Sequence, residues 1–235
     1  MQQLGYAIIA AGLGSRLQQE GILQPKPMIV INGKPMIGRL IEQFADNGAG
    51  RVDVIVNTSN TQTRDYLMNT DFGIDVNLVV KDTPSSMHSL YELAKTGICR
   101  NVDRVVVTTV DTVFDLADFK KYINACRCSN ANALMGITPF VDDEKPLFVD
   151  VDNQNVIQGY YDQKCSCSHV SAGIYGLDSQ AFNVLERTVT QGMSRMRNFQ
   201  RALIDNGLDV QAFRFGKVID VDHATDIEVA QRFLL

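Results

Sequence analysis

The stretch Ala7-Ile8-Ile9-Ala10-Ala11-Gly12-Leu13-Gly14-Ser15-Arg16-Leu17 near the N-terminus decides the fold. Its short, wholly apolar run is typical of a strand in a parallel sheet that is covered on both faces. The two glycines that follow allow backbone N–H groups to approach an anion, because no Cβ stands in the way. Ser15 adds a hydroxyl donor, and Arg16 adds a planar guanidinium suited to phosphate. The stretch therefore predicts a strand that leads into a phosphate-binding loop.

A lysine between two prolines follows this loop, in Pro25-Lys26-Pro27-Met28. The prolines restrict the backbone on both sides, so the ammonium is placed with little loss of entropy. Two familiar glycine motifs do not fit. The dinucleotide fingerprint needs a third glycine where this chain has Leu17, and the Walker loop needs its lysine directly after the last glycine. A tight turn flanked by surface cations would explain the glycines alone, but the added arginine and Pro-Lys-Pro favour an anion site.

Strand and helix patterns alternate four times in the first half of the chain. The expected strands are 6–11, 52–57, 76–80 and 105–110, and the expected helices are 36–47, 61–69, 85–99 and 116–128. This alternation predicts an α/β fold with a three-layer, doubly wound, mostly parallel sheet. Ligands of such sheets bind beyond the carboxyl ends of the strands. The glycine loop and Asp111 both follow such ends.

The second half of the chain is richer in strands. The expected strands are 133–138, 147–151, 156–161, 170–175, 210–215 and 218–221, and the expected helices are 178–189, 195–206 and 223–233. No linker or repeat separates the halves. We therefore expect one domain over residues 1–235, with a nucleotide-binding half at 1–130 and a mixed, acceptor-binding half at 131–235.

Composition excludes several classes of protein. The 235 residues carry a net charge of −5, which argues against a nucleic-acid-binding surface. No signal peptide and no stretch long and apolar enough to cross a bilayer is present, so we expect a cytoplasmic location and no membrane partner. The five cysteines are expected to be reduced thiols, and the one-residue spacing in Cys126/Cys128 and Cys165/Cys167 is not that of a zinc site.

The glycine loop and the Pro-Lys-Pro motif together resemble the signature of the nucleotidyltransferase family that includes sugar-1-phosphate nucleotidylyltransferases. The resemblance implies a Rossmann-like fold in which the loop holds the triphosphate of an NTP. It implies catalytic roles for Arg16 and Lys26, the lysine stabilising the transferring phosphoryl group. The nucleotide-binding residues that we expect are Ala10, Ala11, Gly12, Gly14, Ser15 and Ser86.

Carboxylates at two places in the chain suit a magnesium ion. Asp111 directly follows an apolar strand, where it would face the ligand crevice, and Mg²⁺ bound to a triphosphate takes carboxylate oxygens. Asp115 fits the helix cap of the following helix better than Asp111 does. The stretch 219–228 resembles the closing motif of the family, which makes Asp220 or Asp222 the second metal ligand. Strand alternation predicts that these two point to opposite faces, one towards the metal and the other free to cap the last helix.

The segment Asp82-Thr83-Pro84-Ser85-Ser86-Met87-His88-Ser89-Leu90 links a strand to a helix. Its hydroxyls and helix N-terminus suit a base or an anion, and a plain capping segment is the alternative. Relatives carry a glycine in the matching loop. Because this chain lacks it, the preferred base stays open.

The acceptor site is expected in the second half. Lys164, in a motif that resembles the Glu-Lys element of the family, is predicted to meet the acceptor phosphate, and Lys145 is a competing candidate. Gly173, in a strand that resembles the Asn-Ala-Gly-Ile-Tyr strand of the family, would let the acceptor approach. Ser171 replaces the usual Asn. The stretch 193–197 is basic and apolar where relatives carry an acid for sugar hydroxyls, so it either binds a more anionic group or is a solvated helix start.

The sequence thus predicts an enzyme that transfers NMP from an NTP to a phosphorylated acceptor, most simply a sugar 1-phosphate, with release of pyrophosphate and with Mg²⁺ as cofactor. Two alternatives stay open. One is a cytidylyltransferase for a non-sugar phosphate such as phosphocholine, and the other is a non-catalytic nucleotide-binding subunit. A homo-oligomer is compatible with the sequence.

Overall fold

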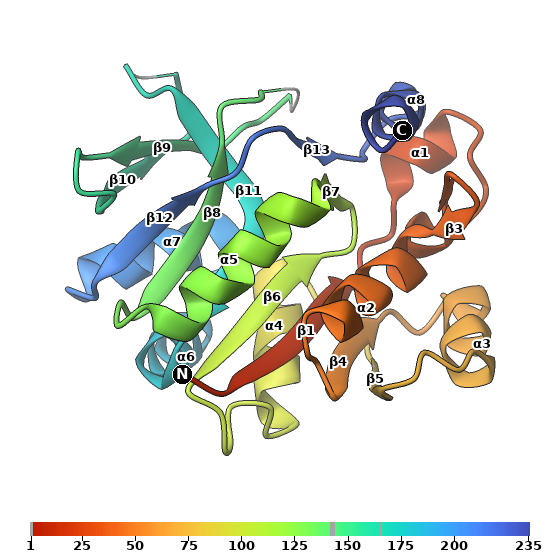
Figure 1. The fold of residues 1–235 in the computed structure, drawn as a ribbon, viewed down its shortest axis with the longest axis horizontal. Helices are drawn as coiled ribbons and strands as arrows, with labels where there is room; N and C mark the ends of the chain where they lie inside the picture. The colour runs from red at the N-terminus through yellow and green to blue at the C-terminus, as the bar shows by residue number, and fades with distance from the viewer. Residues whose placement is uncertain (1, 142–143, 165) are drawn as a thin grey trace.

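The computed structural model describes residues 2–141, 144–164 and 166–235. Within this part of the chain, nine strands form one mixed sheet (Figure 1). Its parallel core consists of β1 (Leu4–Ala10), β4 (Arg51–Val56), β5 (Asp75–Val80) and β6 (Arg104–Thr109). β4 and β6 lie on opposite sides of β1, so the strand order reverses there. The loops that follow β1 and β6 therefore open onto one crevice, the usual ligand position in such sheets.

The second half of the chain extends this sheet beyond β6. Its strands are β8 (Ala133–Thr138), β9 (Phe148–Val151), β10 (Ile157–Tyr161), β11 (His169–Leu177) and β12 (Val210–Arg214). β11 runs antiparallel to β6, β8 and β9, whereas β12 pairs with β8 in parallel. The mixed character expected for this half is thus present in the strand directions.

Helices cover both faces of the sheet (Figure 1). On one face lie α2 (Met36–Asp46) and α5 (Leu116–Cys128), and on the other lie α4 (Ser86–Lys95), α6 (Ser179–Thr190) and α7 (Met196–Asp205). α3 (Thr61–Asn69) packs near the β5 edge. Each face has its own hydrophobic core, because alternate side chains of β1 enter opposite clusters. The three-layer, doubly wound, mostly parallel fold predicted from the sequence is confirmed.

Short elements close the carboxyl end of the sheet. They are α1 (Ser15–Gln19), the 3₁₀ turn η1 (Lys26–Met28), β2 (Val30–Ile31), β3 (Lys34–Pro35), β7 (Thr112–Phe114), β13 (Val218–Asp220) and α8 (Ala224–Phe233). β7 and β13 pair antiparallel, which brings the C-terminal segment beside the loop that follows β6. A third hydrophobic cluster packs these short elements against one another. It includes Leu17, the residue that stands where the dinucleotide fingerprint needs a glycine.

Two expectations about single residues need correction. The helix expected over 85–99 ends at Lys95, because Gly97 has a φ of 82° and breaks the helical conformation. Cys99, Cys126 and Cys128 are free thiols as expected, but Cys167 is disulfide-bonded; Cys165 lies outside the described residues. None of the helices in the described ranges is both long enough and apolar enough to cross a membrane.

Candidate active site

The loop after β1 lines a cleft with a volume of about 480 Å³. The predicted residues that line it are Ala11, Gly12, Gly14, Ser15 and Arg16. A Cβ added at Gly12 would have no atom within 4 Å, so the loop leaves open space beside its backbone. Ala10 is not brought into the cleft. The alternation of side chains along β1 buries it in the core under α2 and α5.

Two contacts fix the shape of this loop. Gly14 has a left-handed conformation, with φ of 63°, and a Cβ there would come within 3.2 Å of the Cβ of Lys26. Asn57, which directly follows β4, donates from Nδ2 to the carbonyl oxygens of Ala11 and Gly12 at 3.2 and 3.3 Å. Asn57 was missed by the sequence analysis. The available signal was a polar residue at the end of a buried strand, which is where this fold gathers its ligand contacts.

Lys26 is buried, with 7% of its side chain exposed. The turn that carries it begins after Pro25 and has Pro27 in its first positions, so prolines flank it on both sides. Its Nζ lies 2.6 Å from Oδ2 of Asp111 and 2.5 Å from Oδ1 of Asp222. Burial lowers the pKa of Lys26, but the surrounding carboxylates outweigh burial and raise it. The ammonium therefore stays charged inside the site.

Asp111, Asp220 and Asp222 each place a ligand oxygen within 4.8 Å of the other two. The prediction that Asp220 and Asp222 point apart is therefore wrong. β13 ends at Asp220, and the N–H of Asp222 donates to the Asp220 carbonyl oxygen at 3.1 Å, so the chain turns back and the alternation of a strand no longer applies. Neither aspartate caps α8. Asp226 does, accepting from the N–H groups of Asp222 and His223 at 2.9 and 2.6 Å.

These three carboxylates fit a magnesium ion. The guanidinium of Arg16 pairs with Asp222 and, at 3.9 Å, with Glu144, so the carboxylates outnumber Lys26 and Arg16 and a net negative charge remains. Oδ1 of Asp111 is buried and has no hydrogen-bond partner among the described residues. Leaving a buried carboxylate oxygen unpaired is costly, and oxygen atoms of this kind are the ligands that Mg²⁺ prefers.

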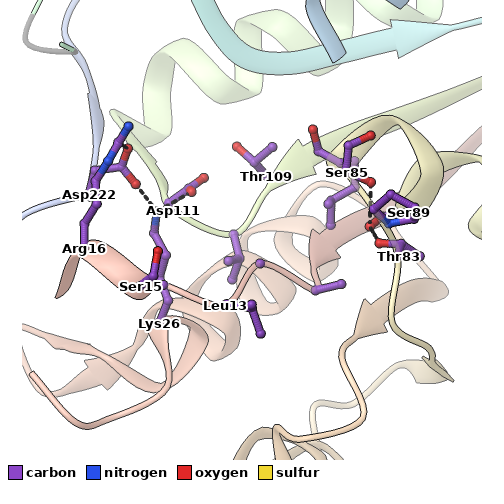
Figure 2. Close-up of a pocket in the computed structure, with 17 residues that line it drawn as sticks. Leu13, Ser15, Arg16, Lys26, Thr83, Ser85, Ser89, Thr109, Asp111 and Asp222 are labelled. Atoms are coloured by element: carbon purple, nitrogen blue, oxygen red, sulfur yellow. Dashed lines mark hydrogen bonds and ion pairs between the residues drawn. The ribbon is translucent and has the colours of Figure 1, made fainter. Parts of the chain in front are cut away.

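Hydroxyl groups at the N-terminus of α4 line the other end of the cleft. Figure 2 shows Thr83, Ser85 and Ser89 at one side and Asp111 with Asp222 at the other. Ser86, the residue predicted for the nucleotide, lies at this helix start and lines the cleft too. Ser85 occupies the N-cap position but makes no side-chain cap bond. Its hydroxyl lies 2.9 Å from Nδ1 of His88, so His88 is held at the helix start, and it does not line this cleft.

A second cleft, of about 510 Å³, meets the first one. The residues that line both are Ser85, Ser86, Thr109 and Asp111. Lys145 lines the second cleft, whereas Lys164 is exposed in the loop after β10 and lines neither. Of the two lysines considered for the acceptor, the structure thus brings Lys145 to the site.

Gly173 lines the second cleft and is required there by the packing of the protein itself. Its φ is 71°, and a Cβ at this position would lie 2.8 Å from the hydroxyl oxygens of both Thr109 and Thr112. The register of β11 against β8 shifts around this residue, between Ser171 and Tyr175. Glycine at this position therefore allows the irregular turn of β11 and the close approach of the two threonine hydroxyls, and it also lines the cleft.

Gln200 also lines the second cleft, and sequence analysis missed it. It is almost fully buried on α7, and its Nε2 donates to Oγ of Ser171 at 2.8 Å. A glutamine within an amphipathic helix carries no local signal of a ligand contact, because only the tertiary fold turns it towards the cleft.

Comparisons with known proteins agree with this geometry. A family model described as the MobA-like NTP transferase domain matches residues 6–164. The bifunctional protein GlmU of Methanococcus maripaludis is 26% identical over 241 residues, which cover 97% of this chain and 54% of that protein. A CMP-5'-(3-aminopropyl)phosphonate synthase of Streptomyces rubellomurinus is 25% identical over 157 residues, 67% of this chain and 24% of that protein.

The fold is also that of solved structures. The inositol-1-phosphate CTP transferase from T. maritima superposes with a TM-score of 0.82 at 17% identity, over 99% of this chain and 97% of that one. This chain spans about half the length of the GlmU protein that it matches. Since the family model covers well over half of the sequence, including the loop, the lysine and Asp111, the chain belongs to the MobA-like NTP transferase domain family.

Proposed function

We propose that this protein transfers a nucleoside monophosphate from an NTP to a phosphorylated acceptor, with release of pyrophosphate. The observation that carries the proposal is the meeting of the two clefts at Asp111, beside Lys26 and the other carboxylates. One cleft has a glycine loop suited to a triphosphate, and the other has Lys145, whose ammonium suits the reacting phosphate of an acceptor. The acceptor class that we propose is a sugar 1-phosphate, which would give an NDP-sugar. Two further relatives are named as a glucose-1-phosphate cytidylyltransferase and a mannose-1-phosphate guanyltransferase, and these names support this class.

The roles of the residues follow from their positions. Gly12, Gly14 and Ser15 would hold the β- and γ-phosphates against the loop, and Asn57 would keep that loop in shape. Magnesium bound by the aspartates would neutralise charge on the triphosphate. Lys26 is held near the same carboxylates and would stabilise the negative charge that develops on the transferred phosphoryl group.

The acceptor needs no general base in this scheme. Its phosphate is already ionised at neutral pH, so one of its oxygens attacks the α-phosphorus directly and pyrophosphate leaves. The work of the protein is then to align the two substrates across the junction of the clefts and to compensate their charges. Because residues from both halves build the site, we propose that residues 1–235 act as one catalytic unit.

Both alternative functions have an observation against them. A phosphocholine acceptor would place its quaternary ammonium in a cleft that Lys145, Arg195 and Arg197 line. A non-catalytic nucleotide-binding subunit would not need the lysine and the three aspartates to converge as they do.

The test is a matrix of the four common NTPs against phosphorylated acceptors, with pyrophosphate as the readout. Asp111→Asn should lower kcat/KM by about 100-fold or more, because it removes a charge from the metal site. Asp115→Asn is the matched control. Asp115 accepts from the N–H groups of Ala117 and Asp118 at the start of α5, and asparagine caps helices as well as aspartate does. Absence of pyrophosphate release with every pair of substrates would overturn the proposal.

A further inference from the structure

The second cleft, which we call the acceptor cleft, has an uneven distribution of charge. Among the described residues, its acidic members are Asp111 and Asp220, and both belong to the carboxylate cluster. Its basic members are Lys145, which we assign to the reacting phosphate, and Arg195 and Arg197, which we call the cationic wall. The carboxylates have Lys26 and the metal site for compensation, so no other acidic side chain among the described lining residues is available to the cationic wall.

Arg197 is fixed in place by its neighbours. Its guanidinium pairs with Asp162 and donates to the carbonyl oxygen of Lys145 at 3.1 Å. Arg201, one turn further along α7, binds the same carboxylate at 2.8 Å. Asp162 is about half exposed and is shared by two arginines, so it neutralises only one of them. The pair of Arg197 and Arg201 therefore keeps one positive charge in excess, and Arg197 presents it to the cleft on a side chain whose orientation is already set.

Arg195 has a different anchor. Its backbone has φ of 74° and ψ of 137°, a conformation that is strained for any residue except glycine. Its N–H donates to Oγ of Ser85 at 3.2 Å, which ties it to the place where the two clefts meet. No carboxylate of the described chain pairs with its guanidinium, and the side chain lines the acceptor cleft. Strain that the fold maintains at a cleft wall points to a use for the arginine side chain.

We propose that the acceptor carries a second anionic group, a carboxylate or a phosphate, besides the phosphate that reacts, and that Arg195 and Arg197 bind this group. The inference rests on the proposed function and narrows its substrate class. A neutral sugar would offer no charge to Arg195, which no carboxylate of the described chain pairs with, and none to the excess charge on Arg197. A cationic acceptor would be repelled. A carboxylate or phosphate matches the planar donor fork of arginine and would bind in charge-assisted hydrogen bonds.

The test compares acceptors that differ only in their second group. Glucose 1-phosphate is neutral beyond its phosphate, glucuronic acid 1-phosphate adds a carboxylate, and glucose 1,6-bisphosphate adds a phosphate. Their binding is measured by calorimetry with Mg²⁺ and an α,β-methylene analogue of each NTP, and pyrophosphate release is measured in parallel with the natural NTPs. We expect at least one of the anionic acceptors to bind about tenfold or more tightly than glucose 1-phosphate, and the stronger of the two identifies the group.

Substitutions in α7 and at its N-cap test which arginines cause the preference for an anionic acceptor. Arg195→Gln and Arg197→Gln should each bring the ratio of affinities towards one. Arg201 lies on the same helix and pairs with the same Asp162, but it does not line the cleft. Arg201→Gln removes an equal charge and should leave the ratio of affinities unchanged. Arg195→Gly removes the charge while suiting the positive φ, so it separates loss of binding from loss of folding.

Three results decide the matter. Equal or tighter binding of glucose 1-phosphate would overturn the inference and leave the proposed function standing. Loss of the ratio in Arg201→Gln to the same extent as in Arg195→Gln would also overturn it, because the effect would then be general charge. If an anionic acceptor binds preferentially but no NTP yields pyrophosphate, the result would support anion binding by Arg195 and Arg197 and would overturn the proposed function.

Discussion

Replacing Lys26 by methionine tests whether charge compensation holds the site together. Methionine keeps an unbranched apolar stem of similar length and removes the ammonium that lies 2.6 Å from Asp111 and 2.5 Å from Asp222. Three carboxylates have oxygens within 4.8 Å of one another, and the variant removes the cation that pairs with two of them, Asp111 and Asp222. The variant should therefore lose stability as well as catalysis.

The magnitude follows from burial. Breaking a buried ion pair from one side costs about 3–5 kcal/mol. Asp111 and Asp222 keep 21% and 27% of their side chains exposed, so the lower figure of about 3 kcal/mol applies. At about 2–4 °C per kcal/mol for a chain of this size, Tm should fall by roughly 6–12 °C. Mg²⁺ at ten times its Kd would raise the free energy of unfolding of the variant by about 1.4 kcal/mol.

The pH dependence should change sign. Burial raises the pKa of Asp111, but Lys26 outweighs burial and lowers it. In the wild type, the stabilisation that the ionised Asp111 gives the folded state is present above the unfolded pKa of 3.8. It is lost as the pH falls through the lower pKa of the folded state. Without the lysine, burial and mutual repulsion raise the carboxyl pKa above the unfolded value. Acidification from pH 7 towards pH 5 should therefore stabilise the variant and not the wild type.

Thermal unfolding followed by circular dichroism measures these effects at pH 7 and pH 5, in EDTA and in Mg²⁺. Lys34→Met is the matched control. Lys34 pairs with Glu42, but both side chains are about half exposed, so its loss should cost less than about 1 kcal/mol. If Lys26→Met unfolds at the wild-type temperature in EDTA at pH 7, or gains no more from Mg²⁺ than the wild type does, the reasoning about charge compensation is refuted.

Further predictions concern single positions. Gly12→Ala should keep the wild-type Tm but raise the KM for NTP about tenfold or more in steady-state assays, because a methyl group would fill the open space beside the loop; an unchanged KM would contradict this. Gly173→Ala should lower the unfolding free energy in urea by about 2–4 kcal/mol, because of its positive φ and the two hydroxyl oxygens at 2.8 Å, and an unaltered midpoint would show that the turn can relax. Cys128 is exposed and should react with iodoacetamide at pH 7.5, whereas Cys126, whose pKa burial raises to about 12, should stay unmodified in peptide mass spectra; comparable labelling would contradict its burial. Arg195→Gly should raise the unfolding free energy by about 1 kcal/mol through relief of backbone strain, and a lower Tm would argue against that strain.

Most of the fold, and the nucleotide side of the site, could be predicted because local patterns carry them. The apolar run before Gly12 and the apolar strand before Asp111 are each buried on both faces, and a doubly wound sheet places the ends of such strands together. The prolines beside Lys26 marked a fixed lysine, but nothing local showed which carboxylates it meets.

What the sequence did not reveal depends on contacts between distant segments. The position of Asp222 depends on where β13 stops, and that is decided by its pairing with β7. Gln200 enters the acceptor cleft only through the packing of α7. The motif resemblance points to Lys164, but it carries no information on the path of the loop after β10, and the structure brings Lys145 to the cleft. Ala10 is a different case, because the alternation of side chains along β1 is a local pattern and by itself places Ala10 in the core under α2 and α5.

The pairing of β7 with β13 has a consequence for the order in which the molecule is assembled. Arg16 and Asp222 are 206 residues apart, and the N–H of Val221 donates to the carbonyl oxygen of Asp111 at 3.0 Å. During synthesis the loop, the lysine and Asp111 all emerge long before their last two carboxylate partners. A nascent chain therefore holds Lys26 and Arg16 without Asp222 until the segment after β13 has been synthesised, and the cluster of three carboxylates is complete only then. A metal ion bound by the three aspartates would stabilise the pairing of β13 with β7, so its binding would report that this segment has docked.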